Sequence, residues 1–383
     1  MSRSLALGAA GFCASISWQI VTPVLPLRLA HLGYSPAQIG LLVGIFSLTM
    51  GLVELQAGVI AAAIGRRWAI LAGYAANALC LTVAATAPAR VVVAGSLAAV
   101  GAARGVLVPP LHATVAESAA VEMRGRAFGI FWLFASLAAL TGPAIGGFAA
   151  GQYGDRAPFL LGALFSLAAL PMIAAQPVPG RAGRGASLGE LTVFLSDPSI
   201  ARIGVSMILC YSLAGIWTTF LPLYASQHGA SVVVIGWIFA IQGGMYALMQ
   251  IPTGRLVALE GGRWLAPAGI AAMAATVVIV PLLRTTPSLL VAGACYRVAV
   301  GIMPVTFATL VTRGVSSEQY TAAMSVFNSA IDLGLFAGPL LGAAAAQFNV
   351  AAPFLLALPL GLTAVAMSVR VAHPASAAAP GSQ

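Results

Sequence analysis

Long apolar segments separated by short polar breaks constrain this chain more than any other feature of its sequence. Twelve segments of roughly 20 or more residues occur, near 5–30, 37–63, 68–87, 91–116, 125–151, 157–176, 200–226, 232–258, 263–283, 287–313, 320–347 and 351–371. A helix of about 20 residues crosses the hydrocarbon core of a bilayer. Because 60% of the residues are hydrophobic and only 7% are charged, water could not accommodate the folded chain. The sequence therefore predicts an all-α membrane protein with twelve transmembrane helices.

Composition and spacing also exclude several classes of function. The net charge of +9 comes from arginines scattered singly between apolar runs, so no nucleic-acid-binding face is expected. The four cysteines, Cys13, Cys80, Cys210 and Cys295, lie inside apolar runs without the spacing of metal ligands. His112 stands alone in the fourth segment, which favours a structural role. Without a Ser/His/Asp cluster or a phosphate-binding loop, we expect no enzyme, no cofactor and no metal site.

The arginines indicate how the chain crosses the membrane. The first apolar segment is about 25 residues long and leads into another, so it reads as a retained helix and not as a cleaved signal peptide. An N-terminus in the cytoplasm assigns these arginines to that side: Arg3, Arg66, Arg67, Arg124, Arg126, Arg181, Arg184, Arg202, Arg255, Arg263, Arg313 and Arg370. The other side receives only Arg28, Arg90, Arg156 and Arg284. The positive-inside rule therefore predicts two cytoplasmic termini, in a bacterial inner membrane.

The chain contains an internal duplication with an offset of 196 residues. ELQAGVIAAAIGRRW at 54–68 aligns without a gap with QIPTGRLVALEGGRW at 250–264, and Gly142-Pro143 aligns with Gly338-Pro339. The repeat predicts two six-helix halves, 1–176 and 200–371, joined by a cytoplasmic linker at 177–199. The linker holds a short helix expected to begin at Ser187, with Glu190 three residues on. The tail at 372–383 is expected to be disordered.

The first copy of the repeat resembles the loop between helices 2 and 3 of major facilitator superfamily transporters, which reads G-x-L-a-D-R-x-G-R-R. Gly58, Gly65, Arg66 and Arg67 match this pattern, whereas its Asp position is Ala62. The resemblance covers essentially the whole chain. It implies two pseudo-symmetric bundles with a small-molecule substrate bound between them near the midplane of the bilayer, and transport by alternating access. We expect a monomer.

Two further motifs resemble a narrower group, the twelve-helix drug:proton antiporters. Pro23-Val24-Leu25-Pro26 resembles P-v-x-P, and the run from Gly142 and Pro143 to Gly146 and Gly147 resembles G-P-x-x-G-G. This resemblance implies proton-coupled efflux of small apolar or amphipathic compounds, although such glycines also serve plain helix packing. The alternative is a facilitator or importer of a sugar or organic anion. A membrane receptor or scaffold that transports nothing is a third possibility.

Polar residues in the apolar segments mark a candidate substrate cavity. Ser15, Gln19 and Thr22 share one helical face, and the repeat places Tyr211 and Thr218 at related positions. Trp18 and Trp217 lie beside these stripes, where they could stack on a substrate or only anchor the helix at the interface. Arg104 and Arg297 lie at membrane depth, where a charge faces a cavity or binds carbonyl groups of neighbouring helices.

Two carboxylates, Glu54 and Asp332, also lie at membrane depth. Burial favours their neutral form and a nearby arginine favours their charged form, so such a group can carry a proton. Asp332 ranks first as the carrier because Asn328 lies one turn before it, and Glu54 ranks second. The alternative is a buried structural ion pair with an arginine. Near the cytoplasmic surface, Glu117, Glu122, Arg124 and Arg126, together with Arg66 and Arg67, resemble the pairs that latch the two halves of such transporters.

Overall fold

The computed structural model describes residues 3–87, 89–118, 123–176, 178, 198–260, 264–312 and 320–372, and every regular element among them is a helix. The first half contains α1 (Arg3–Gln19), α2 (Leu25–His31), α3 (Pro36–Ile64), α4 (Arg66–Thr86), α5 (Arg90–Glu117), α6 (Arg124–Tyr153) and α7 (Ala157–Ala174). The second half contains α9 (Pro198–Gln227), α10 (Val232–Glu260), α11 (Leu265–Val278), η2 (Val280–Leu282), α12 (Thr286–Thr312), α13 (Tyr320–Ala346), α14 (Ala352–Leu355) and α15 (Ala357–Ala372). The helix expected at Ser187 and the tail from 373 lie outside the described residues.

Eleven helices among the described residues are long and apolar enough to cross a membrane. The remaining predicted segment, 5–30, is not one continuous helix, because α1 ends at Gln19 and α2 begins only at Leu25. Pro23 lies in the break and Pro26 follows it, and proline has no amide hydrogen to continue a helical ladder. The carbonyl of Trp18 instead accepts a hydrogen bond from the Thr22 amide at 2.9 Å. The fold is therefore the expected twelve-segment bundle with its first segment broken.

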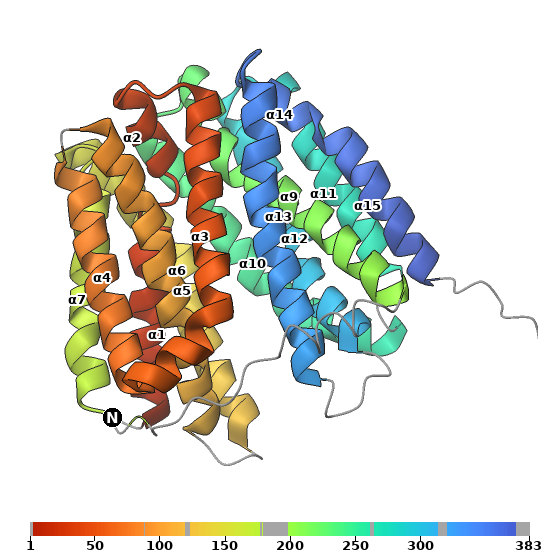
Figure 1. The fold of residues 1–383 in the computed structure, drawn as a ribbon. Coiled ribbons are helices and arrows are strands. Elements are labelled where there is room, and N and C mark those ends of the chain that lie inside the picture. Colours follow the sequence, from red (N-terminus) through yellow and green to blue (C-terminus); the bar gives the residue numbers. More distant parts are fainter. Residues whose placement is uncertain are drawn as a thin grey trace, which may run out of the picture.

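Two seams join the halves, one between α3 and α13 and one between α6 and α10. Figure 1 shows α3 and α13 side by side at the front of the bundle, close together at one end and diverging towards the other. A Cβ added at Gly40 would lie 2.7 Å from the Pro339 carbonyl oxygen, and one added at Gly147 would lie 2.9 Å from the Gly236 Cα. These glycines allow backbone to touch backbone where the helices meet.

The glycine contacts lie near one end of the bundle. They join the first turns of α3 and α10 to the last turns of α6 and α13, close to the turns at Gly154 and Gly229. We call this end of the bundle the closed face. The opposite end carries the turn between α3 and α4 at Gly65, and we call it the open face because α3 and α13 diverge towards it (Figure 1).

Arg28 secures α2 at the closed face. Its side chain is only 2% exposed. It donates hydrogen bonds to the carbonyl oxygens of Ala84 and Ala85, at the end of α4, at 2.9 and 2.8 Å. It also forms an ion pair with Asp155 at 2.8 Å. A cation at the carboxyl end of a helix interacts favourably with the helix dipole. Arg28 therefore caps the carboxyl end of α4 and holds α2, the second part of the broken first segment, against it.

Candidate functional site

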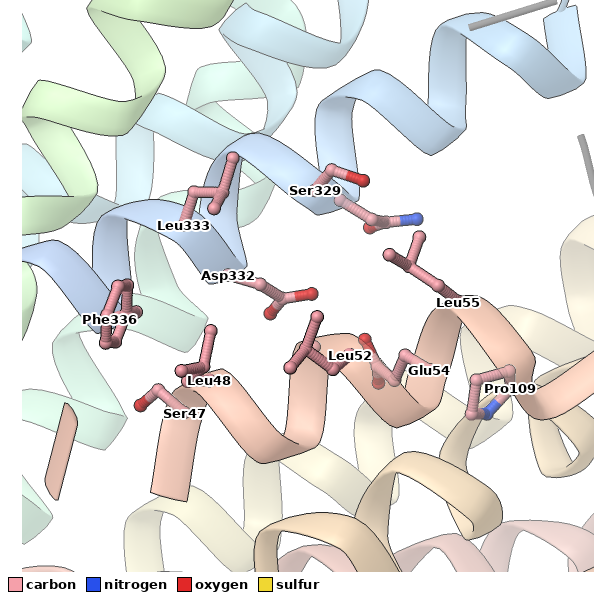
Figure 2. A pocket seen from close by; sticks show the side chains of 12 residues that line it. Ser47, Leu48, Leu52, Glu54, Leu55, Pro109, Ser329, Asp332, Leu333 and Phe336 are labelled. Atoms are coloured by element: carbon pink, nitrogen blue, oxygen red, sulfur yellow. The ribbon is translucent and has the colours of Figure 1, made fainter. Parts of the chain in front are cut away.

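A pocket of about 410 Å³ lies between the two halves on the α3–α13 seam. Its walls come from α3, α5 and α13: Ser47, Leu48, Gly51, Leu52, Glu54, Leu55, Pro109, Asn328, Ser329, Asp332, Leu333 and Phe336. Figure 2 shows Glu54 on the α3 side of this pocket and Asp332 on the α13 side. The volume falls within the range of small-molecule sites. Most of the lining is apolar, and the polar groups are few and clustered.

The two membrane-depth carboxyls meet in this pocket, although the sequence offered them only as separate candidates. Asp332 packs against Gly51, where an added Cβ would lie 3.3 Å from the Asp332 Cβ. The Glu54 and Asp332 carboxyls are close enough for a protonated one to donate a hydrogen bond to the other. Arg104 acts on Glu54 electrostatically. Two carboxylates this close do not both ionise without a compensating cation, so the pair favours uptake of one proton.

Arg104 belongs to an aromatic cluster in the first half. Trp18 is stacked on Phe46 with ring centroids 4.1 Å apart, and the Arg104 guanidinium lies 5.6 Å from the Trp18 centroid. The Arg104 Nη1 donates a hydrogen bond to the Ala14 carbonyl at 3.0 Å. Arg104 thus binds a carbonyl of a neighbouring helix and lies near Glu54, which combines the two roles considered for it.

Arg297 occupies a comparable place in the second half. Its Nε donates to the Gln242 side-chain oxygen at 3.4 Å, and the Trp217 indole donates to the same oxygen at 3.1 Å. Trp217 is stacked on Tyr296 at 4.1 Å, and the Arg297 guanidinium lies 5.8 Å from the Tyr246 ring. Trp217 is fully buried in this conformation, where it donates to Gln242 and packs on Tyr296.

Sequence reasoning missed Gln242, Tyr246 and Tyr296. Gln242 was detectable as an isolated amide in the apolar run of α10. Nothing in its spacing from Arg297 or Trp217 indicated that the three side chains meet.

The polar stripes have mixed surroundings. Ser15, Gln19, Thr22 and Thr218 are half-buried, whereas Tyr211 is buried against Gly334. The hydroxyls of Thr22 and Thr218 donate to carbonyls of their own helices, Trp18 and Ala214. Among the residues predicted to line a substrate cavity, Asn328 lies in the pocket with Glu54 and Asp332. Cavity lining by the other members stays a prediction.

The charges near the open face pair within the first half in this conformation. Arg66 is buried and pairs with Glu117, which joins α4 to α5. Arg67 donates to the Ala174 carbonyl at the end of α7. Both interactions lie within the first half, so in this conformation they brace that half and do not latch it to the other. At this end of the bundle α3 and α13 diverge (Figure 1), and a latch between the halves stays a prediction.

The other members of this loop lie around the same turn. Gly65 has a φ of 89°, which disfavours any residue with a Cβ and explains the glycine between α3 and α4. Gly58 is half-buried on α3, and Arg126 is exposed at the start of α6. Glu122 and Arg263 lie outside the described residues.

The Gly-Pro motifs pack helices in two different ways. Gly142 and Gly146 face Gln19 and Ile20 of the broken first segment, inside the first half. Gly147 faces Val232 and Gly236 of α10, across the seam. In the second half, Gly338 packs on Ser212, and the Pro339 ring packs on Gly215. One short motif therefore serves both internal packing and the contact between halves.

Solved transporters share this fold over nearly the whole chain. A bacterial homologue of the human lysosomal transporter Spinster, inward-facing and unoccupied, matches with a TM-score of 0.77 and 15% identity, over 96% of this chain and 94% of that one. The nucleoside transporter NupG matches with a TM-score of 0.80 and 14% identity, over 97% and 98%. A POT family transporter in complex with 5-aminolevulinic acid gives 0.81 and 11%, over 96% and 95%. At these identities the likeness establishes the fold alone.

Relatives by sequence are distant but nearly full-length. The multidrug resistance protein MdtH of Aeromonas hydrophila is 23% identical over 92% of this chain and 91% of its own length. The uncharacterized MFS-type transporter MJ1560 of Methanocaldococcus jannaschii is 23% identical over 85% and 86%. The family model described as Major Facilitator Superfamily matches residues 7–232 and 203–383. The chain is therefore an integral membrane protein of the major facilitator superfamily, a family of transporters and not of enzymes.

Proposed function

We propose that this protein exports small apolar or amphipathic compounds in exchange for protons. The observation that supports this most is the meeting of Glu54 and Asp332, one from each half, in a pocket on the seam. A proton bound there depends on contact between the halves. Because alternating access changes that contact, proton uptake and release become coupled to the conformational change. The multidrug resistance relatives support the export direction.

We also propose that the open face is cytoplasmic and that the protein is a monomer in a bacterial inner membrane. The arginine bias supports this orientation, because Arg66 and Arg67 lie at the open face. The structural likeness to an inward-facing transporter is in keeping with it.

Transport into proteoliposomes with an imposed pH gradient tests the function. Asp332→Asn should abolish gradient-driven transport of a substrate found by screening, while the purified variant still binds that substrate. Arg156→Gln removes a charge at an exposed position outside the pocket and should retain transport. Full gradient-driven transport by Asp332→Asn would exclude Asp332 as the carrier. Loss of folding, rescued only when Arg104 or Arg297 is also neutralised, would favour a structural ion pair.

The alternative, a facilitator or importer of a sugar or organic anion, has one observation in its favour. Arg297 is half-buried beside Tyr246 and Tyr296, a combination of charge and rings that suits a polar solute. Solute uptake down a concentration gradient, at a rate that does not depend on the pH gradient, would support this alternative.

A further inference from the structure

We propose that the pocket between α3 and α13 is a lateral binding site, open to the lipid, for an amphiphile that carries one positive charge. The charged group of the ligand lies between Glu54 and Asp332, and its apolar part lies against the leucines at the mouth of the pocket. The proposal specifies the substrate class for the export function and rests on that function.

The charges in and around the pocket leave room for one cation. Glu54 and Asp332 contribute two negative charges when both are ionised, and Arg104, which acts on Glu54, contributes one positive charge. The remaining polar groups of the pocket, Ser47, Asn328 and Ser329, are neutral. One proton or one monovalent cation therefore neutralises the net negative charge of the site. An anionic ligand would add to that charge. Proton and ligand compete for the same place, which is the relation that exchange transport needs.

The apolar part of the pocket points away from the protein core. Leu52, Leu55 and Leu333 line the pocket, yet they are 56%, 58% and 49% exposed. Leu41 and Val59 continue the exposed row on the same face of α3, at 45% and 67%. Figure 1 shows no helix in front of α3 and α13. In a chain that spans a bilayer, an exposed row of leucines faces lipid tails, so a ligand dissolved in the membrane reaches the carboxyls without crossing the protein.

The structure favours this site over the arginine clusters for a hydrophobic ligand. Arg104 is already bound to the Ala14 carbonyl, and Arg297 to Gln242. Both clusters carry positive charge, which would repel a cation. The α3–α13 pocket joins an apolar wall to an excess of negative charge, which suits an amphipathic cation.

Two probes of the same shape and opposite charge test the ligand class. Purified protein in lipid nanodiscs is titrated with tetraphenylphosphonium and with tetraphenylborate at pH 8 and pH 5. We expect saturable binding of the phosphonium at pH 8 that weakens at pH 5 through competition with protons. Glu54→Gln and Asp332→Asn should each weaken it at least tenfold, whereas Arg156→Gln, which removes a charge at an exposed position outside the pocket, should not. Tetraphenylborate should show only partitioning into the lipid, unchanged in every variant.

Equal binding of both probes, or wild-type phosphonium binding by both acid variants, would overturn the proposal. A gel-filtration profile like that of the wild type shows that a variant is folded. If one of the two acid variants does not fold, the other still tests the proposal. Phosphonium binding without any proton-driven transport would leave the site intact and refute the export function. Proton-driven transport of a substrate that phosphonium does not displace would support the export function and refute the proposed site.

Spin labels test the lateral opening. In a variant without its native cysteines, labels at Leu52→Cys and Leu333→Cys should collide more with oxygen, which dissolves in lipid, than with a water-soluble nickel chelate. Bound phosphonium should reduce the oxygen collisions at both positions. Greater access of the nickel chelate would place the mouth of the pocket in water and refute access from the bilayer.

Discussion

Adding one methyl group at Gly147 should shift the protein away from the conformation described here. Gly147 lies on the α6–α10 seam, where a new Cβ would lie 2.8 Å from the Val232 carbonyl oxygen and 2.9 Å from the Gly236 Cα. Both neighbours are backbone atoms, which cannot rotate out of the way. Because these neighbours belong to the other half, the clash is relieved when the halves separate at the closed face.

The neighbouring glycine supplies a matched control. A Cβ at Gly146 would overlap the Ile20 carbonyl, which belongs to the same half and stays beside it in either conformation. Overpacking of this kind costs about 1–3 kcal/mol. Gly146→Ala should therefore lower the free energy of unfolding by about that amount. Gly147→Ala should shift the conformational equilibrium by roughly 5- to 150-fold instead.

Disulfide trapping measures the shift. Gly151 and Val233 lie opposite each other on the same seam, with an added Cβ at Gly151 only 2.7 Å from the Val233 Cγ2. In a variant without native cysteines, Gly151→Cys with Val233→Cys should form a disulfide readily, because the side chains are within bonding reach. Adding Gly147→Ala should slow this reaction, and adding Gly146→Ala should not. Equal trapping rates for the two alanine variants, with equal losses of thermal stability, would refute the assignment of Gly147 to the moving seam.

Three further outcomes follow from the contacts. Arg28→Gln should lower the free energy of unfolding by about 1–3 kcal/mol in a thermal or denaturant assay, since it removes the guanidinium from the Ala84 and Ala85 carbonyls and leaves Asp155 with His31 as its partner. Arg156→Gln, at an exposed position nearby, should change it little. Arg297→Gln and Arg297→Lys should both weaken binding of any anionic substrate, with normal expression, and unchanged transport of every tested solute would remove Arg297 from the mechanism. Ala62→Asp restores the acid that the loop motif usually carries and should favour closure of the open face, as measured by labelling of cysteines there; identical labelling would contradict a role for this position.

The sequence was sufficient for the architecture because its signals are repeated and local. Segment length predicts spanning helices one by one, and the 196-residue repeat groups them into halves. The continuous first helix was wrong, since Pro23 and Pro26 ended the ladder where hydropathy alone indicated no break. The prolines indicate where the helix breaks, but a hydropathy average over about 20 residues is insensitive to a single missing amide hydrogen.

The site was less predictable because it depends on contacts between distant segments. Glu54 and Asp332 were identified by the cost of a charge in lipid, yet their meeting depends on the α3–α13 seam, which no local pattern encodes. The same limit explains the latch. We expected Arg66 and Glu117 near the cytoplasmic surface as parts of a latch, and the pair that they form lies inside one half. Helix face and depth can be read from spacing, whereas the partner of a side chain cannot.

The placement of the ion pairs has a consequence for how the protein responds to its surroundings. Arg28 with Asp155 and Arg66 with Glu117 both act within one half, while the described glycine contacts of the α6–α10 seam are with backbone and apolar atoms. Dissolved salt weakens attraction between exposed charges over about 10 Å at 0.1 M, but it does not act on atoms in van der Waals contact. Changes in ionic strength should therefore leave the opening of the α6–α10 seam largely unaffected. The lipid that presses on the two halves, through its thickness and lateral tension, acts directly on that opening.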